Sequence, residues 1–371
     1  MASTTTIPVQ EWARGQAPLA SARPRGRIVA KDQPRSAVRS LHLLADTRVA
    51  LGFAGGTVAS PRGLQLRDGT DLRLVREVIG AGHPVAPAPG GRFFLGSGGD
   101  EGACHVVDLN AGSNIDGFPL QAPYLWLDPP REDGTGGRFL AKTPPHAHGT
   151  TRSEADPAWI SAHPFLAPLL DRPMQLVVVD RDARSARFLL TKDMVDRGAN
   201  HLCLSPDGSR LYLATQTEVS AVEASTGAEI WRQAVGTYGS ESFVSIYALA
   251  LSADGQHLAS GGIAAGRQSE QALTILDAAT GKFRFAIGMS TIGGTSIRSL
   301  AFHPSGWVAA GSSSGMLALV KPDGRRRVFT GAPRGLEALM FVDDGAALLV
   351  GGAEKQMRLY GLLDDERDGS F

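Results

Sequence analysis

The stretch that decides the fold consists of His201-Leu-Cys-Leu-Ser-Pro-Asp-Gly208, Arg210-Leu-Tyr-Leu-Ala-Thr215, Val219-Ser-Ala-Val-Glu-Ala-Ser-Thr-Gly227 and Glu229-Ile-Trp-Arg-Gln-Ala234. Four short apolar runs alternate with turns that contain Asp-Gly or Thr-Gly. Such pairs supply the positive φ that tight hairpins need. The stretch therefore predicts one antiparallel sheet of four short strands.

The same arrangement recurs three more times towards the C-terminus. The glycine of the first turn falls at positions 208, 255, 306 and 345, so successive units are 47, 51 and 39 residues apart. This spacing is close to the period of about 40 to 50 residues that is typical of β-propeller blades. No segment keeps a 3.6-residue apolar period for ten residues, which argues against a helical repeat.

The N-terminal half contains three further units of the same kind. Their apolar runs lie within residues 41–75, 85–109 and 124–190, and the third unit is interrupted at about residues 142–173. The last unit lacks a fourth strand, which residues 27–31 can supply, and this pairing would protect an open sheet edge. We therefore predict a single, all-β, seven-bladed β-propeller of four-stranded antiparallel blades, closed by an N-terminal strand.

The predicted propeller covers residues 27–363, between a flexible N-terminal arm (1–26) and an acidic C-terminal tail (364–371). Lysine plus arginine and aspartate plus glutamate number 37 each, so no overall charge favours nucleic acid as a partner. Two cysteines without CxxC spacing indicate a reducing compartment. No apolar run is long enough for a membrane span, and we expect a soluble, cytoplasmic protein.

Two segments carry a resemblance to known families. Leu204-Ser-Pro-Asp-Gly-Ser-Arg-Leu-Tyr-Leu-Ala214 and Ala224-Ser-Thr-Gly227 resemble WD-repeat and YVTN-type propellers, over roughly residues 36–363. The Trp-Asp pair of WD repeats is replaced by Leu276-Asp277 in one blade, and no blade has the complete signature. The resemblance implies the propeller fold and a general habit of assembling proteins, with lactonases or cofactor enzymes as a minority.

The interruption of the third blade is the part of the sequence that the fold explains least, because such long loops are usually functional or disordered. Its apolar side chains must bury against the propeller or against a partner, and its prolines favour an extended path, with a helical turn near 155–162 as an alternative. His146 and His148 would bind a metal only with a third ligand such as His163, and we expect no metal and no cofactor. The candidate partner-binding residues are His146, His148, Trp159, Phe165, Leu169 and Leu170.

Other polar residues have simpler explanations. Asp207, Asp254, Asp343 and Asp344 lie where turns are expected and are interpreted as turn formers. The glycine pairs at 55–56, 98–99, 261–262 and 351–352 each follow a second strand and are interpreted as hairpin turns, not as phosphate-binding loops.

Two functions are compatible with these observations. The first is a non-enzymatic scaffold, a subunit of a larger cytoplasmic assembly, that docks another protein through propeller loops and the blade-three interruption. The alternative is a lactonase-like hydrolase, or a binder of a small molecule, that uses the central channel. The channel candidates are Arg39, His42, Arg298 and Glu337.

Overall fold

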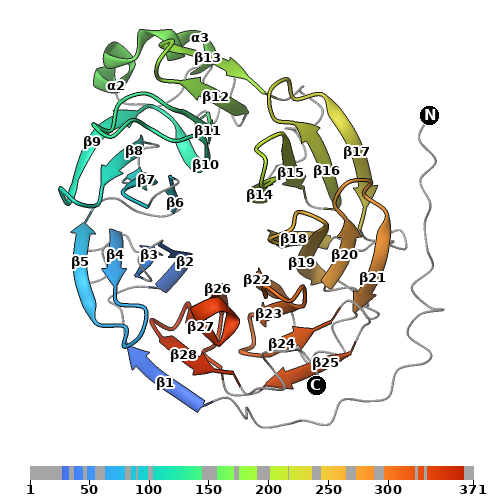
Figure 1. Cartoon of the computed structure of the whole chain (residues 1–371). Helices are drawn as coiled ribbons and strands as arrows, with labels where there is room; N and C mark the ends of the chain where they lie inside the picture. Colours follow the sequence, from blue (N-terminus) through green and yellow to red (C-terminus); the bar gives the residue numbers. More distant parts are fainter. Residues whose placement is uncertain are drawn as a thin grey trace. The chain divides into compact units, whose positions relative to one another are not determined.

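The computed structural model describes residues 27–32, 37–44, 48–54, 63–79, 85–88, 91–98, 103–143, 157–170, 175–189, 201–215, 217–235, 244–264, 273–287, 296–321, 325–329 and 332–362. Within these residues, seven antiparallel sheets of four strands each follow one another along the chain (Figure 1). The sheets are the blades of a β-propeller, so the predicted fold class is confirmed. The backbone forms two compact units, residues 34–198 and residues 199–371 with strand β1.

The unit of residues 34–198 contains blades one to three. Each blade is a meander in which the strands pair in chain order. Its strands are β2 (Ala37–Leu43), β3 (Val49–Ala54), β4 (Gly63–Arg67), β5 (Leu74–Ile79), β6 (Val85–Pro87), β7 (Phe93–Gly98), β8 (Ala103–Asp108), β9 (Ser113–Phe118), β10 (Gln121–Asp128), β11 (Arg138–Lys142), β12 (Leu176–Asp180) and β13 (Ser185–Phe188).

The other unit contains blades four to seven. Its strands are β14 (His201–Leu204), β15 (Arg210–Ala214), β16 (Glu218–Glu223), β17 (Glu229–Ala234), β18 (Val244–Leu251), β19 (His257–Ala264), β20 (Leu273–Asp277), β21 (Phe283–Ile287), β22 (Ile297–Phe302), β23 (Val308–Ser312), β24 (Leu317–Val320), β25 (Arg326–Phe329), β26 (Leu336–Val342), β27 (Ala347–Gly352) and β28 (Met357–Gly361). The first strands β14, β18, β22 and β26 pack against one another in that order.

Blade seven is completed by the N-terminal strand β1 (Arg27–Asp32). This strand pairs antiparallel with β28, and Ile28 lies opposite Tyr360. Figure 1 shows β1 in blue beside β28 in red. The predicted closure is confirmed, and β28 gains a partner for the backbone groups that would otherwise form an open edge.

The first turn of the repeat is held by its own side chains. The Ser205 hydroxyl donates to Asp207 Oδ1 at 2.5 Å, and the Ser209 backbone N donates to the same oxygen at 3.1 Å. Ser252 and Asp254 repeat the first of these contacts, also at 2.5 Å. The hydrogen bond from Ser205 is the main reason why the pKa of Asp207 falls to about 2. Both aspartates are turn formers, as predicted.

Asp343 and Asp344 also lie in a turn. They belong to the short 3-10 helix η2 (Asp343–Gly345), and both have positive φ values, of 54° and 48°. Aspartate adopts this left-handed conformation more readily than most residues. These two aspartates therefore make the bend between β26 and β27.

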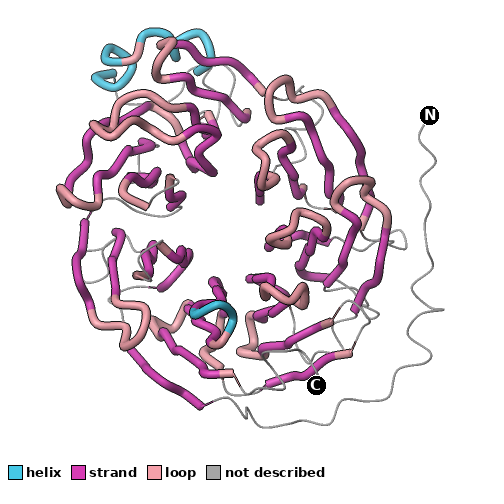
Figure 2. The backbone as a smooth tube through the Cα atoms, viewed as in Figure 1, coloured by secondary structure: helices cyan, strands magenta, loops and turns pink. Residues whose placement is uncertain are grey.

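The interruption of blade three is helical where it is described. Between β11 and β12 lie α2 (Pro157–Ala162), η1 (Pro164–Leu166) and α3 (Ala167–Leu170), which Figure 2 shows together in cyan. The expectation of an extended path was wrong for residues 164–170. Pro164 is the first residue of η1 and Pro168 the second of α3, and proline is tolerated in the first turn because its missing N–H has no partner there.

Two pairs of glycines lie inside strands and not in turns. Gly261 and Gly262 belong to β19, and Gly351 and Gly352 belong to β27. Gly98 ends β7, whereas residues 55–56 and 99 lie outside the described residues. The interpretation of the pairs 261–262 and 351–352 as turns was therefore wrong; a Cβ atom on Gly262 would lie 2.1 Å from the carbonyl oxygen of Ser245 on the opposite strand β18.

No helix in the described part of the chain is long and apolar enough to cross a membrane.

Candidate functional site

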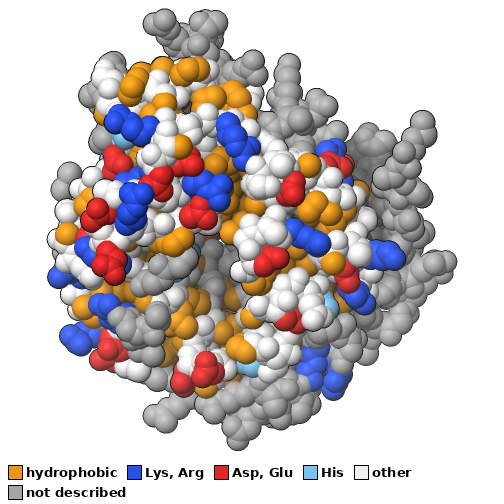
Figure 3. Space-filling model, turned by 45° about the horizontal axis from the view of Figure 1, so that its top comes forward, with side chains coloured by type: hydrophobic (Ala, Val, Ile, Leu, Met, Phe, Trp, Pro, Cys, Tyr) orange, Lys and Arg blue, Asp and Glu red, His pale blue; other side chains and the backbone are white. Residues whose placement is uncertain are grey.

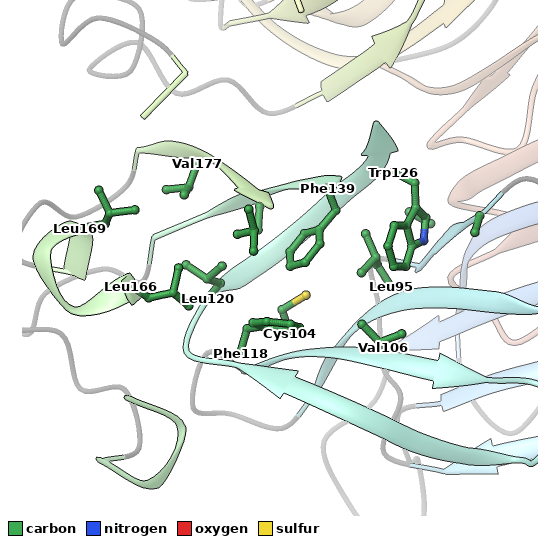
Figure 4. Packing of buried hydrophobic residues seen from close by; sticks show 14 of the residues in the cluster. Leu95, Cys104, Val106, Phe118, Leu120, Trp126, Phe139, Leu166, Leu169 and Val177 are labelled. Carbon is green, nitrogen blue, oxygen red and sulfur yellow. The ribbon is translucent and has the colours of Figure 1, made fainter. Parts of the chain in front are cut away.

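Residues 157–170, here called the insertion helices, are fixed to blades two and three by apolar packing. Leu166, Leu169 and Leu170 are buried in one hydrophobic cluster with side chains of β7 to β12. Figure 4 shows Leu169 near Val177 and Leu166 beside Leu120. The buried area of three leucines stabilises such packing by roughly 5 kcal/mol relative to exposed side chains. The insertion helices are thus part of the core.

A polar contact adds a second attachment. Asp116 on β9 accepts from Arg181 Nη2 at 3.0 Å and lies 3.4 Å from Nε2 of His163, which separates α2 from η1. The His163 ring stacks on Phe118 with a centroid distance of 4.3 Å. Arg181 also donates to the carbonyls of Gly134 and Gly136, both at 2.8 Å. One carboxylate therefore joins blade two, the β12–β13 turn and the insertion helices.

The protonation of this region follows from its burial. Burial raises the pKa of Asp116, but the hydrogen bond from His163 and the positive charge of Arg181 outweigh this effect and hold that pKa below its usual value. Burial raises the pKa of the neighbouring Cys104 thiol far above its usual value, and it does the same for Cys203. Asp116 is therefore ionised at neutral pH, whereas both thiols are protonated and unreactive.

The exposed side chains described on the insertion helices carry no charge and, apart from Ser161, are apolar. Residues 157–170 contain no lysine, arginine, aspartate or glutamate. Ala162, Pro164, Ala167 and Pro168 are exposed, and we call these four residues the insertion surface. In the space-filling view, hydrophobic side chains gather at the top of the molecule, where Figure 1 places α2 and α3 (Figure 3). The insertion is thus an ordered element with a charge-free outer side.

The predicted partner-binding residues have different positions. Phe165 is half-buried beside His163. Leu169 and Leu170 are buried in the cluster and are not available to a partner, because α3 turns their side chains towards the blades. Trp159 belongs to α2, but its side chain lies outside the described residues, as do His146 and His148. Two of the six candidate residues are therefore buried, and partner binding by this segment stays a prediction.

A metal site formed by His163 with His146 and His148 is not tested, because the last two are not described. Nε2 of His163 faces Asp116. Across the described ranges, no group of three His, Cys, Asp or Glu side chains is arranged to hold a metal ion.

A second group of polar residues lies on the first strands of blades five to seven. The pairing of β18 with β19 skips one residue between Ile246 and Ala248, and this residue is Tyr247. The pairing of β22 with β23 skips Arg298, and that of β26 with β27 skips Glu337. Such β-bulges bend the strand and redirect the side chain of the extra residue. We call Tyr247, Arg298 and Glu337 the bulge residues.

The glycines in the second strands explain why the bulges fit. A Cβ atom on Gly262 would lie 2.1 Å from the Ser245 carbonyl oxygen, and one on Gly311 would lie 2.6 Å from the Ser299 hydroxyl. A side chain at either position would collide with the bulged strand. Gly262 was present in the sequence as a signal for its bulge, but its interpretation as part of a hairpin turn hid it.

Arg298 and Tyr247 are in direct contact. The guanidinium carbon lies 4.0 Å from the centroid of the tyrosine ring, and both side chains are half-buried. Burial, followed by the positive charge of Arg298, lowers the pKa of His201 on β14 to about 4. His201 is therefore neutral at pH 7, and the positive charge in this region is that of Arg298.

The four predicted channel candidates belong to both units. Arg298 and Glu337 are bulge residues, and Arg39 occupies the corresponding bulge of β2, between Val38 and Ser40. His42 lies in regular register opposite Ala50. Tyr247 was missed by the sequence reasoning, because an aromatic residue on a strand is most simply explained as core.

Comparison with known proteins gives no closer assignment: no protein-family model matches the chain, and no curated protein matches its sequence. The class of protein is defined by the fold, which is a seven-bladed β-propeller with repeated units. The similarity of Leu204–Ala214 to WD repeats stays a prediction.

Proposed function

We propose that this protein is a non-enzymatic scaffold that docks another protein through the insertion surface. The observation that carries the proposal is the two-sided structure of residues 157–170. Their inner side is fixed by three buried leucines and by Asp116, and their described exposed side chains are free of charge and, apart from Ser161, apolar. The β-propeller fold itself is compatible with a scaffold in general.

Two physical arguments support docking at this place. The central parts of protein interfaces are depleted in charged residues, and the insertion surface has none. A surface that is already ordered loses little conformational entropy when a partner binds, so more of the contact energy appears as affinity. We expect the partner to be a subunit of the same cytoplasmic assembly.

The test is affinity capture of the tagged protein from the cells that produce it, compared with a variant that carries Ala162→Arg and Ala167→Arg. Both alanines are exposed, so the substitutions leave the core intact while placing two charges on the insertion surface. The control is Ala183→Arg, an exposed alanine in the β12–β13 turn of the same unit. Thermal unfolding establishes that all three proteins are folded.

We expect a partner at stoichiometric yield with the wild-type protein and with Ala183→Arg, and at least a tenfold lower yield with the double variant. The proposal fails if no stoichiometric partner is recovered. It also fails if the double variant retains the partner as well as the control does.

A further inference from the structure

The bulge residues are held rigidly. The buried Ser299 hydroxyl, next to Arg298, donates to the carbonyl of Leu336 at 3.1 Å, next to Glu337. This bond joins β22 to β26 at the two bulges. The glycines opposite the bulges, Gly262 and Gly311, allow the strands to approach closely. Arg298 and Tyr247 therefore project from backbone whose position is fixed by packing and hydrogen bonding.

The guanidinium group of Arg298 has unused donors. Among the described residues, the contact assigned to it is the stacking on Tyr247, and it forms neither an ion pair nor a hydrogen bond. Stacking uses the face of the guanidinium plane and leaves its edge, with the N–H groups, available. Other arginines of this unit are neutralised, such as Arg284, which lies 2.6 Å from Asp277.

The surroundings of Arg298 favour an anion. His201 stays neutral at pH 7, so it adds no positive charge to that of Arg298. The effect of Arg298 on the pKa of His201 also indicates that its charge is felt on β14, the first strand two blades away. Glu337, at the equivalent position of β26, takes part in another interaction.

We propose that Arg298, stacked on Tyr247 at the bulges of β22 and β18, binds the carboxylate group of a small organic acid. The planar fork of guanidinium N–H groups matches the two oxygens of a carboxylate. The half-buried position suits a small molecule, because part of the Arg298 side chain stays exposed to solvent. The site is independent of the insertion surface and goes beyond the proposed docking function.

The test is a titration of the full chain, labelled with ¹⁵N-arginine, with acetate, benzoate and inorganic phosphate, followed through the arginine Nε–Hε signals. We expect saturable 1:1 binding of the carboxylates and a shift of the Arg298 signal. Arg298→Lys keeps the charge but loses the fork and the stacking, and we expect it to weaken binding roughly 10- to 100-fold, as measured by calorimetry.

Matched variants separate this site from general electrostatics. Tyr247→Phe keeps the stacking ring and should retain affinity within about twofold, whereas Tyr247→Leu should weaken binding several-fold. Arg284→Ala removes the same charge from β21 and should have no effect. The double variant at Ala162 and Ala167 should also leave carboxylate binding unchanged, so the two proposals fail independently.

Three results would overturn the proposal. The first is the absence of saturable carboxylate binding to the wild-type protein. The second is an equal loss of affinity in Arg298→Lys and Arg284→Ala, which would indicate a diffuse charge effect. The third is a preference of at least tenfold for phosphate, or for an acidic hexapeptide over the free acids, which would assign the site to a different ligand.

Discussion

Gly281 lies beneath the indole ring of Trp231, and this contact joins blades four and five. A Cβ atom at Gly281 would lie 2.5 Å from the indole, whose Nε1 donates to the carbonyl of Ala278 at 3.1 Å. Gly281 also has a φ of 70°. Two separate constraints, backbone conformation and space, therefore require glycine at this position.

Gly281→Ala tests the second constraint. We expect it to lower the free energy of unfolding by about 3 kcal/mol, from the positive φ and from the displaced indole. Gly208→Ala is the matched control, because Gly208 has a φ of 72° but no atom within 4 Å of the added Cβ. It should cost about 1 kcal/mol, from the backbone alone. Urea denaturation measures the free energy of unfolding of both variants. An equal loss in Gly281→Ala and Gly208→Ala would contradict the role of the indole.

His201 makes stability depend on pH. Its pKa is about 4 in the folded protein and 6.5 in a model peptide. Between these values the unfolded chain binds a proton that the folded chain does not, so the free energy of unfolding falls as the pH decreases from 6.5 to 4.

We expect the loss of stability between pH 7.5 and pH 5.0 to be smaller in His201→Gln than in the wild-type protein, by about 2 kcal/mol. Urea denaturation at the two pH values provides the measurement. A pH dependence that is identical in the two proteins would show that His201 is not the responsible group.

Most strands could be predicted from the repeat, because the turn residues mark their ends. The four strands of blade four agree with the apolar runs almost residue for residue. Strand β9 was missed, since Ser113–Phe118 is exposed over its first three residues and lacks an alternating apolar pattern. Helix α2 agrees with the helical turn given as an alternative near residues 155–162, whereas η1 and α3 were hidden by prolines that lie in their first turns.

The attachment of the insertion could not be predicted from sequence. Asp116, His163 and Arg181 are far apart in the chain, and none belongs to a recognisable motif. They meet only because β9 and the β12–β13 turn lie on neighbouring blades. By contrast, the interrupted repeat made the insertion itself evident. Three of the predicted channel candidates, Arg39, Arg298 and Glu337, proved to occupy bulges.

Strand β1 allows a prediction at the level of the blade. Deletion of residues 1–32 removes the partner of β28 and exposes an unpaired strand edge. We expect the melting temperature to fall by about 5 °C or more and soluble aggregates to appear in size-exclusion chromatography. Deletion of residues 1–26 keeps β1 and should behave like the wild-type protein. Similar behaviour of the two deletions would mean that β1 is not required.

The whole molecule has no net charge, since 37 basic side chains balance 37 acidic ones. Long-range attraction of a partner is therefore weak, and the insertion surface adds no charge of its own. The proposed binding of a carboxylate at Arg298 differs from docking at the insertion surface, because it depends on the charge of one partly exposed cation. Salt should thus affect the two proposed sites differently.

We expect recovery of the protein partner to change less than about twofold between 50 and 300 mM NaCl, because the insertion surface carries no charge to be screened. Carboxylate binding should weaken clearly over the same range. Capture and calorimetry at the two salt concentrations measure the effects. A steep loss of the partner with salt would contradict docking through the insertion surface.

The pairing of β1 with β28 has a consequence for synthesis on the ribosome. Tyr360, the partner of Ile28, is translated 332 residues after it. At about 5 to 20 residues per second, this interval lasts roughly 20 to 60 s. Blades one to six contain only strands that are neighbours in sequence, so each can form as it emerges. Blade seven is the exception, and β1 must wait without its partner until translation of the propeller is complete.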